Sequence, residues 1–460
     1  MSLHYDEIID EKCRSAILEY TASGRKSAFI KTFGCQQNEA DSEKALGILK
    51  SLGYSIADSY ENADLIIFNT CAVRAHAEEK VLSLLGELKA KKRKNPELII
   101  GIMGCMGAVP RTVELLKRDF HYVSFTLGAG AMHRLPEILF GIIKDGKRRF
   151  IIPDECEKIV EGIPEYRKSK ASAYVSIMYG CNNFCSYCIV PYTRGRERSR
   201  RSECIIEECK RLIGGGAKQI MLLGQNVNSY LADMDFPTLL LAIAKIPGNF
   251  TIRFMTSHPK DVSDRLIEVM SENPEKIAPI FHLPLQSGSD RILLDMNRKY
   301  DRRKFIETAE KIKKKIPGVT LTTDVIVGYP SESEEDFSDT LDVLSRVRFD
   351  AVYAFLYSPR SGTRAAQRRD TVPEDIKRER IGRLLSMQDE ISLQINRALL
   401  GQCVTLFAES FELGIGGRYS GRTAGGKLVH FSSDTPPSGN FIRVKIISAE
   451  PYSLIGEAVE

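Results

Sequence analysis

The chain has 460 residues, too many for one ordinary domain, and this length favours roughly two to four domains with sizeable cores. Its composition is globular, with 43% hydrophobic and 27% charged residues, and no apolar run approaches the roughly 20 residues that span a bilayer. The acidic, polar start MSLHYDEIIDEKCRS is unlike a signal peptide or a transit peptide. We therefore expect a cytoplasmic protein that does not bind membranes.

The net charge is only +5, but the basic residues are bunched. The runs are KAKKRK at 89–94, RGRERSRR at 194–201, KIKKK at 311–315 and a basic stretch at 368–383. A basic run is most often a solvated helix face, but several runs around a metal site would favour a polyanionic partner. The eleven cysteines do not suit a disulfide framework in a reducing compartment, so cysteines that cluster indicate metal binding or catalysis.

From about Ala28, short apolar runs alternate with amphipathic stretches. The runs SAFIKTF, ADLIIFNT and ELIIGIMG are typical of buried strands, and a helix-like segment follows each one. This alternation predicts an open parallel sheet with helices on its faces. We place this first domain at 26–150, because the polar, turn-rich stretch PDECEKIVEGIPEYRKSKAS then breaks the pattern.

The alternation resumes over 168–397, where helix candidates separate six strand candidates: AYVSIMY, QIMLLG, TIRFMT, PIFHLP, VTLTTDVIVG and DAVYAFLY. This pattern predicts a partial (β/α)6 barrel of parallel strands. After a basic amphipathic helix that ends near Arg397, short strands with Gly-rich and Asn-rich turns predict a small all-β barrel over 399–460. The expected fold class is therefore α/β, with two α/β domains and a C-terminal all-β barrel.

Three cysteines fall within eight positions in YGCNNFCSYCIVPY, which spans 179–192. Cys181, Cys185 and Cys188 form a C-x3-C-x2-C pattern, and thiolates at such tight spacing are typical ligands of a [4Fe–4S] cluster. A structural zinc site would need a fourth ligand nearby, but no Cys or His follows until Cys204. Three protein ligands leave one iron of a four-iron cluster open, and a small molecule can coordinate there.

A second set of three cysteines is spread over the first domain. Cys35, Cys71 and Cys105 each follow one of its three predicted strands. Because the carboxyl ends of parallel strands share the edge where ligands bind, we expect these cysteines to converge on a second cluster site. The other cysteines lack this context, and we interpret them as structural: Cys13, Cys156, Cys204, Cys209 and Cys403.

The C-x3-C-x2-C loop after the first barrel strand resembles that of the radical S-adenosylmethionine (SAM) superfamily. The resemblance implies that the amino and carboxylate groups of SAM chelate the open iron, and that the reduced cluster cleaves SAM to a 5′-deoxyadenosyl radical. Tyr187 occupies an aromatic position that members of the superfamily often place against the adenine. Simple packing is an equally good interpretation of this side chain.

Further motifs resemble the methylthiotransferase family along nearly the whole chain from about residue 26. They are FGCQQNEADSE, NTCAVRAHAEEKV and GIMGCMGA in the first domain, then PYTRGRERSR, LLGQNVNSY, RFMTSHP, HLPLQSGSDRIL and YSPRSGT in the second. GCQQN followed by NTCAVR is most similar to the MiaB type, whose substrate is isopentenyl-adenosine in tRNA. One departure is Gln37, where such sequences often carry Met. The C-terminal barrel resembles the TRAM domain, an RNA-binding module of these enzymes.

The resemblance implies that the C2 hydrogen of N6-isopentenyl-adenosine, next to the tRNA anticodon, is replaced with a methylthio group. It implies two [4Fe–4S] clusters, of which the one on Cys35, Cys71 and Cys105 carries the sulfur. It also implies two uses of SAM, one as methyl donor and one as radical source. The implied partners are a tRNA anticodon stem-loop carrying isopentenyl-adenosine and an electron donor such as a flavodoxin or ferredoxin, and we expect a monomer.

The SAM site should lie at the C-terminal mouth of the barrel, where loops converge. Gln225 and Asn226, at the end of the second barrel strand, are expected to contact SAM, and Gln286 and Ser287, after the fourth strand, are weaker candidates for the same role. Arg194, Arg196, Arg198 and Arg200 follow the cluster loop, and of these Arg194 is expected to hold the SAM carboxylate or RNA phosphates. Weaker candidates, each of which could be a cap or turn residue instead, are Ser257, His258, Gly328 and Glu332.

In the C-terminal barrel, basic residues are expected to contact RNA phosphates: Arg418, Arg422, Lys427, Arg443 and Lys445. The alternative is that this barrel merely covers the side of the catalytic barrel. For the whole chain, one alternative is a methylthiotransferase for threonylcarbamoyl-adenosine in tRNA or for a ribosomal-protein aspartate, but GCQQN differs from the GCKVN and GCPKN motifs of those relatives. Another is a non-catalytic iron–sulfur RNA-binding protein, against which the intact triplet and its barrel argue.

Overall fold

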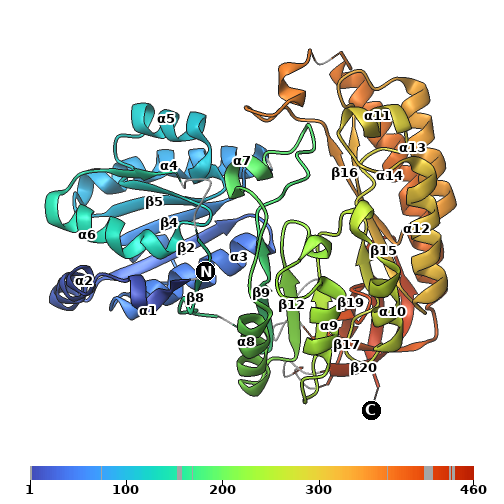
Figure 1. Cartoon of the computed structure of the whole chain (residues 1–460), viewed down its shortest axis with the longest axis horizontal. Coiled ribbons are helices and arrows are strands. Elements are labelled where there is room, and N and C mark those ends of the chain that lie inside the picture. The colour runs from blue at the N-terminus through green and yellow to red at the C-terminus, as the bar shows by residue number, and fades with distance from the viewer. Residues whose placement is uncertain are drawn as a thin grey trace.

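The computed structural model of the chain describes residues 3–73, 75–152, 158–167, 169–369, 371–408, 418–434, 437 and 441–459. Figure 1 shows a sheet domain and a partial barrel side by side, with a small all-β barrel at one end of the partial barrel. None of the helices within these ranges is long and apolar enough to cross a membrane.

The first domain contains a six-stranded sheet in which every pair of neighbours is parallel. In spatial order its strands are β3 (Ser55–Ile56), β2 (Ser27–Phe33), β4 (Leu65–Thr70), β5 (Ile99–Gly104), β6 (Phe125–Gly128) and β7 (Arg149–Ile151). The open parallel sheet predicted from the sequence is therefore confirmed, and β3, β6 and β7 extend it. The strand order reverses between β2 and β4, and such a reversal creates a ligand-binding crevice at the carboxyl ends of the strands.

Helices cover both faces of this sheet, which explains why every residue of β4 and β5 is buried. One core contains α3 (Gln36–Ser51) and α6 (Leu135–Asp145), and the other contains α4 (Ala75–Lys94) and α5 (Pro110–Asp119). The segment before residue 26 also belongs to this domain, because α2 (Glu11–Gly24) packs on α6 and α1 (Tyr5–Ile8) adds Tyr5 to the same core. In addition, β1 (Leu3–His4) pairs with β8 (Val160–Glu161).

The central domain is built from two three-stranded parallel sheets, in the orders β13-β12-β9 and β14-β15-β16. Their strands are β9 (Ser172–Ser176), β12 (Gln219–Leu223), β13 (Thr251–Phe254), β14 (Ile280–His282), β15 (Thr320–Val327) and β16 (Ala351–Leu356). The segment before β14 joins the two sheets, because Ile252 of β13 donates to Lys276 O at 2.7 Å and accepts from Ala278 N at 2.9 Å. The six strands thus follow one another around an incomplete barrel, as predicted, with β9 and β16 at its edges.

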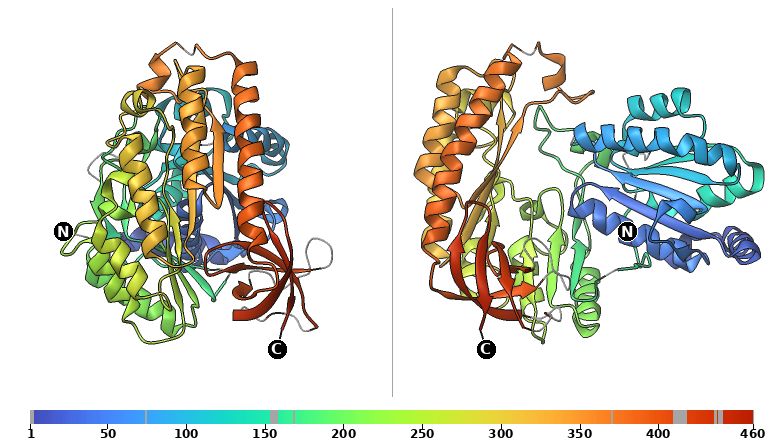
Figure 2. Two further views of the ribbon diagram at one scale, coloured as in Figure 1. Left: turned by 90° about the vertical axis from the view of Figure 1, so that its right-hand side faces the viewer. Right: turned by 180° about the vertical axis from the view of Figure 1, so that it is seen from behind.

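Helices pack on the outer surface of the partial barrel. They are α8 (Ser202–Gly214), α9 (Phe236–Ala244), α10 (Asp264–Glu272), α12 (Arg302–Lys315), α13 (Glu334–Val347) and α14 (Glu374–Arg397). Figure 2 shows that α12, α13 and α14 run side by side along this surface. The shorter elements are α7 (Val190–Arg194), α11 (Asp290–Asp295) and a small antiparallel pair, β10 (Met178–Tyr179) with β11 (Arg198–Ser199).

The third domain is a closed barrel in the order β17-β18-β19-β21-β20, which confirms the predicted all-β fold. Its strands are β17 (Cys403–Ala408), β18 (Tyr419–Thr423), β19 (Leu428–Ser432), β20 (Phe441–Ala449) and β21 (Leu454–Ala458). The turn between β18 and β19 fits against the central domain so closely that a Cβ on Gly425 would lie 2.4 Å from Thr320 Oγ1. Thr320 begins β15, so this small barrel covers the amino ends of the strands of the partial barrel, opposite the end where their carboxyl termini lie.

Lys427 fastens the small barrel to the central domain. Its Nζ lies 2.6 Å from Asp350 Oδ1 and 3.0 Å from Asn396 Oδ1. Both charged side chains are largely buried, at 16% and 9% exposure. The sequence predicts that Lys427 contacts phosphates, but its ammonium group forms an ion pair between two domains instead. Arg443 and Lys445, by contrast, are exposed on β20.

Replacing Lys427 with Met should loosen the small barrel. The substitution leaves the Asp350 carboxylate buried without its cation, and breaking such a buried pair costs about 3 kcal/mol. Urea unfolding should report that loss, and amide exchange in β18 and β19 should accelerate. Lys445→Met, on the exposed face of β20, is the matched control and should change stability by less than about 0.5 kcal/mol. Equal stabilities of the two variants would contradict the interdomain role.

Candidate metal centres

The three cysteines of the first domain lie at one edge of its sheet, as expected. Cys35 caps the start of α3 just after β2, Cys71 follows β4, and Cys105 follows β5. Because β2, β4 and β5 are adjacent strands, their carboxyl ends bring the three loops together. Cys71 N also donates to Phe33 O at 2.9 Å, which ties the second loop to the first.

Buried amides connect these loops. Asn38 Nδ2 donates to Asn69 Oδ1 at 3.0 Å, and Asn69 Nδ2 donates to Asn38 O at 2.7 Å. Gly104, directly before Cys105, has a φ of +88°, and a Cβ there would lie 2.3 Å from Asn69 Oδ1. Glycine is thus required at this position both by its conformation and by the close approach of the asparagine.

The other triplet forms a compact loop after β10. Gly180 precedes Cys181 with a φ of +76°, and a Cβ there would lie 2.0 Å from Arg196 O. The loop is closed by hydrogen bonds from Cys181 N to Gly195 O at 3.1 Å and from Cys188 N to Cys185 O at 2.9 Å. Burial, followed by the neighbouring Cys185, raises the pKa of the Cys188 thiol to about 12. A bound metal ion would offset this effect, because it favours the thiolate.

A polar segment that the sequence analysis missed supports this loop. Ser186 Oγ donates to Asp295 O at 2.9 Å, and Asn297 Nδ2 donates to Asn183 O and Phe184 O at 3.1 and 3.0 Å. Arg298, which is 8% exposed, donates from Nη1 to Cys185 Sγ at 3.3 Å. The sequence signal is the polar stretch MNRKY after the HLPLQSGSDRIL motif, but no local spacing links it to cysteines more than 100 residues away.

The two triplets meet at the domain interface. Ile189, next to Cys188, packs in one buried cluster with Ala72 and Cys105 of the first domain. Arg194, at the end of α7, is 6% exposed; it donates from Nε to Cys105 Sγ at 3.2 Å and from Nη2 to Asp41 Oδ2 at 3.0 Å. In the described structure, no three His, Cys, Asp or Glu side chains converge closely enough to hold a single metal ion.

The other arginines after the cluster loop do not form one free basic face. Arg200 is buried and paired with Glu161 and Glu208, at 2.9 Å from Nε and 2.7 Å from Nη2 respectively. Arg196 stacks its guanidinium 4.5 Å from the centre of the Phe184 ring. Arg194 likewise bonds to Asp41 and Cys105, so its contacts lie on the side of the cysteine triplet of the first domain.

Two expected SAM residues, Gln225 and Asn226, follow β12 at the mouth and differ in their bonding. Asn226 is bonded at both ends of its amide: Nδ2 donates to Asp261 Oδ2 at 2.7 Å, and Oδ1 accepts from His258 N at 2.9 Å. Asn226 therefore holds the loop after β13. Gln225 Oε1, by contrast, is buried and has no hydrogen-bond partner among the described residues.

More buried polar atoms lack partners within the described ranges at this end of the barrel, namely both amide atoms of Asn228, Ser257 Oγ and His258 Nε2. Buried polar groups are almost always hydrogen-bonded, so this group indicates a polar ligand site next to Gln225. His258 Nδ1 accepts from Lys260 N at 3.3 Å, which leaves Nε2 as the protonated nitrogen of a neutral ring. Burial, then the cations of Arg298 and Lys260, lowers the pKa of His258 to about 2.

The remaining expected SAM residues have mixed surroundings. Gln286 has a φ of +70° and bonds through its backbone to β15, from N to Asp324 O at 2.8 Å and from Ile326 N to its O at 2.9 Å. Ser287 is fully buried and accepts from Ser289 N at 3.3 Å. Tyr187 is half-buried against a core cluster that contains Met296 and Tyr329, and burial raises the pKa of its phenol.

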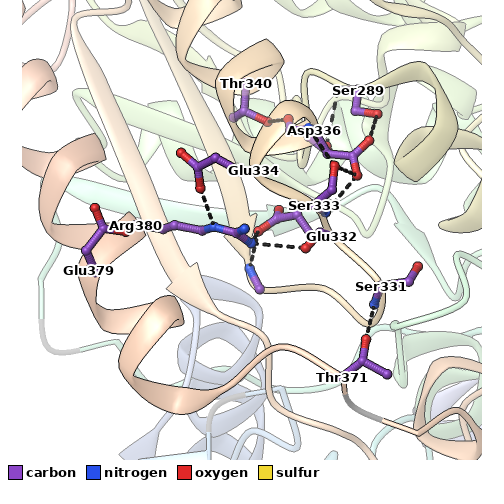
Figure 3. A network of polar contacts seen from close by, with 12 residues as sticks. Ser289, Ser331, Glu332, Ser333, Glu334, Asp336, Thr340, Thr371, Glu379 and Arg380 are labelled. Atoms are coloured by element: carbon purple, nitrogen blue, oxygen red, sulfur yellow. Dashed lines mark hydrogen bonds and ion pairs between the residues drawn. The ribbon is translucent and has the colours of Figure 1, made fainter.

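Glu332 belongs to a structural network that Figure 3 shows, and the backbone N–H of Gly328 bonds to it. Glu332 is 5% exposed, and its Oε2 accepts from Gly328 N at 2.8 Å and from Arg380 Nη1 at 3.0 Å. Arg380 of α14 also donates to Glu334 Oε2 at 3.2 Å. Burial raises the pKa of Glu332 to about 7, against the lowering effects of the Gly328 N–H and Arg380. These residues fasten the loop after β15 to α14.

The cysteines that we interpreted as structural are separate from both triplets in sequence. Cys209 is fully buried in the core of the partial barrel, and Cys13 is buried on α2. Cys204 is half-buried on α8, whereas Cys403 is exposed on β17. Cys156 lies outside the described residues.

Known proteins resemble this chain over the same two regions. Residues 175–344 match the Radical SAM superfamily and contain one triplet, and residues 27–128 match the uncharacterized protein family UPF0004 and contain the other. The chain is 46% identical to a tRNA-2-methylthio-N(6)-dimethylallyladenosine synthase of Alkaliphilus oremlandii, over 98% of this chain and 97% of that protein. A synthase of the same name from Clostridium perfringens is 47% identical, over 95% of this chain and 98% of that protein.

Among solved structures, the radical S-adenosylmethionine methyltransferase TsrM from Kitasatospora setae superposes with a TM-score of 0.53 at 12% identity. The match covers 74% of this chain and 77% of that one. At such low identity the likeness concerns the fold alone, and it supports the partial barrel described above.

His258 gives a pH-dependent prediction. The unfolded chain takes up a proton at this residue as the pH falls below about 6.5, whereas the folded protein keeps the ring neutral down to about pH 2. Because the folded-state pKa lies below the unfolded-state value, protons bind preferentially to the unfolded chain. The free energy of unfolding is therefore highest above pH 6.5 and decreases as the pH falls. Between pH 7 and pH 5 the loss should be about 2 kcal/mol.

His258→Asn should remove that loss, because asparagine can still accept the Lys260 N–H but does not titrate. The check is urea unfolding of wild type and variant at pH 7 and pH 5. Two cations, Arg298 and Lys260, lie near the ring, and Tyr300 contacts it edge-on at 5.6 Å. The same pH dependence in both proteins would refute the assignment.

Proposed function

The chain belongs to the tRNA-2-methylthio-N(6)-dimethylallyladenosine synthase family, and on that premise we propose that it replaces the C2 hydrogen of N6-isopentenyl-adenosine, next to the tRNA anticodon, with a methylthio group. It is a radical SAM methylthiotransferase. The observation that carries the proposal is that Ile189 and Arg194, shortly after one cysteine triplet, contact Cys105 of the other. A reaction that joins a radical at carbon to a stored sulfur requires this proximity.

Each triplet suits a [4Fe–4S] cluster with one open iron. N–H donors point at cysteine sulfurs in both: Asn183 Nδ2 to Cys181 at 3.4 Å and Arg298 to Cys185 in one, Val73 N to Cys71 at 3.1 Å and Arg194 to Cys105 in the other. Such donors stabilise negative charge on a cluster and thereby tune its reduction potential. When bound, the clusters with SAM would supply the 5′-deoxyadenosyl radical, the methyl group and the sulfur.

The protein's own part is to bind, orient and exclude water. The buried polar atoms of Gln225, Asn228, Ser257 and His258 would receive the polar groups of SAM at the ends of β12 and β13. His258 Nε2 donates there without adding charge, because burial keeps the ring neutral. Asn226 is a positioning residue for this loop. Gln286, Ser287 and Tyr187 stay in the proposal as further SAM contacts.

The partner in this proposal is the anticodon stem-loop of a tRNA that carries isopentenyl-adenosine. The adjacent exposed cations Arg443 and Lys445 on β20 suit RNA phosphates, which supports an RNA-binding role for the TRAM-like barrel. A flavodoxin or ferredoxin would donate electrons, and the enzyme would act as a monomer in the cytoplasm. The names of the relatives favour isopentenyl-adenosine over threonylcarbamoyl-adenosine.

Two cysteine variants test this function. With SAM, a reductant and an isopentenylated anticodon stem-loop, the wild type should form 5′-deoxyadenosine and a methylthio-nucleoside detectable by mass spectrometry. Cys181→Ala should abolish both, because the radical site loses a ligand. Cys71→Ala should lose about half of the iron and all methylthio product, while 5′-deoxyadenosine still forms without coupling to product.

Cys403→Ala is the matched control, because this cysteine is exposed on β17 and remote in sequence from both triplets. It should keep full iron content and both products. A Cys181→Ala protein that still made 5′-deoxyadenosine at the wild-type rate, or a Cys71→Ala protein with unchanged iron, would contradict the assignment of the clusters. Product formed only with threonylcarbamoyl-adenosine would overturn the choice of substrate.

A further inference from the structure

The inner and outer faces of the sheet β14-β15-β16 carry different side chains. On the outer face Leu321, Val325 and Val352 are buried in the main core beneath the helices. The register pairs His282 with Thr322, Asp324 with Tyr353, and Ile326 with Phe355, and these residues form the opposite face. That face looks into the incomplete barrel.

The first domain contacts the inner face at the other edge of the barrel. Ala40 of α3 packs with Met221 and Leu223 of β12, and Gln37 Nε2 donates to Ser176 Oγ of β9 at 2.9 Å. At the β16 edge, two aromatic side chains stay open: Tyr353 is 50% exposed and Phe355 is 45% exposed. Two large exposed aromatics at alternate positions of one strand form a continuous surface, which generally indicates a binding site.

The Tyr353 ring contacts a histidine that is itself held by hydrogen bonds. The His282 ring lies 6.0 Å from the Tyr353 ring, and His282 is fixed by Thr322 Oγ1 at 2.9 Å from Nδ1 and by Asp324 Oδ2 at 3.3 Å from Nε2. A fixed aromatic surface binds a flat ligand at a low entropic cost, because little of it must be ordered on binding.

Positive charge borders the aromatic pair. The segment 358–369, which leaves β16 at its carboxyl end, contains four arginines and no acidic residue. It spans both cysteine sites: Arg360 Nη2 donates to Val73 O at 2.7 Å, two residues after Cys71, and Ala365 N donates to Ser186 O at 2.8 Å within the cluster loop. A ligand on the aromatic pair would therefore lie between the mouth of the barrel and this cationic segment.

We propose that Tyr353 and Phe355 form a stacking platform for the unpaired nucleotides beside the target adenosine, with Arg360 and Arg364 on the neighbouring phosphates. The inference rests on the proposed function and names the surface that recognises its RNA loop. To reach the clusters, the target base must leave the loop's stack, and the bases next to it then lose a stacking partner. Aromatic side chains beside a cationic groove are the usual replacement in single-strand binding.

A second copy of the chain suits this surface less well. A two-fold symmetric contact through the β16 face would bring the arginine segment of one copy towards that of its partner, and like charges would repel. An RNA loop offers flat bases for the aromatic pair and phosphates for the arginine segment.

The test measures binding of a fluorescently labelled, isopentenylated anticodon stem-loop to the full-length, cluster-loaded protein by anisotropy. Tyr353→Leu and Phe355→Leu keep apolar bulk but lose the π-face, and each should weaken binding about tenfold. The conservative controls Tyr353→Phe and Phe355→Tyr should stay within about twofold of wild type, since the ring is kept. The leucine variants should leave the salt dependence unchanged, whereas Arg360→Gln and Arg364→Gln should each reduce its slope by about one.

Thermal unfolding and iron content of each variant exclude misfolding, since both side chains are half exposed. If the wild type binds and reacts but the leucine variants bind equally well, the platform is refuted and the proposed function stands. If the wild type neither binds the stem-loop nor forms product, the proposed function fails as well. A leucine variant that turns a dimer into a monomer at unchanged RNA affinity would show a self-association surface instead and overturn the inference.

Discussion

The buried ion pair between Arg194 and Asp41 fixes the relation between the two cysteine sites. Arg194 belongs to α7, directly after the C-x3-C-x2-C loop, and Asp41 belongs to α3, directly after Cys35. Both side chains are less than 10% exposed, and Arg194 also donates to Cys105. A buried charge that loses its partner costs about 3 to 5 kcal/mol, so the two loops cannot separate without a large penalty. Chemistry that passes between two sites depends on such a fixed distance.

Helix α3 is the element through which the first domain is positioned. Cys35 stands at its N-cap, and Gln37 donates to both Asp41 Oδ1 at 3.1 Å and Ser176 Oγ at 2.9 Å. One turn farther on, Lys44 lies 3.4 Å from the Tyr179 hydroxyl and 3.9 Å from Glu165. Gln37 therefore makes a polar bridge across the interface that a methionine could not make.

The described contacts with the other domains cover part of the inner surface of the incomplete barrel. The first domain covers the inner face near β9 and β12, and the turn of the small barrel covers the amino ends of the strands. The inner face at β16 carries the exposed aromatics and continues into the arginine segment. A macromolecular substrate would meet the structure at this edge, where aromatic surface, positive charge and both cysteine loops adjoin. The TRAM-like barrel adds exposed cations at the far end of the strands.

The sequence by itself determined the features that depend on residues close together in the chain. The spacing of Cys181, Cys185 and Cys188 indicates a cluster loop without any tertiary information, and the apolar runs of β4 and β5 indicate buried parallel strands. The position of the other three cysteines, after adjacent strands at one edge of the sheet, also followed from a general rule, because parallel strands end at one edge of their sheet. What the tertiary structure decided were the partners of polar and charged side chains. Arg194 meets Asp41 across 153 residues, Arg298 meets Cys185 across 113, and Lys427 meets Asp350 across 77. Such contacts depend on how separate domains pack, and no periodicity in a single sequence encodes that packing.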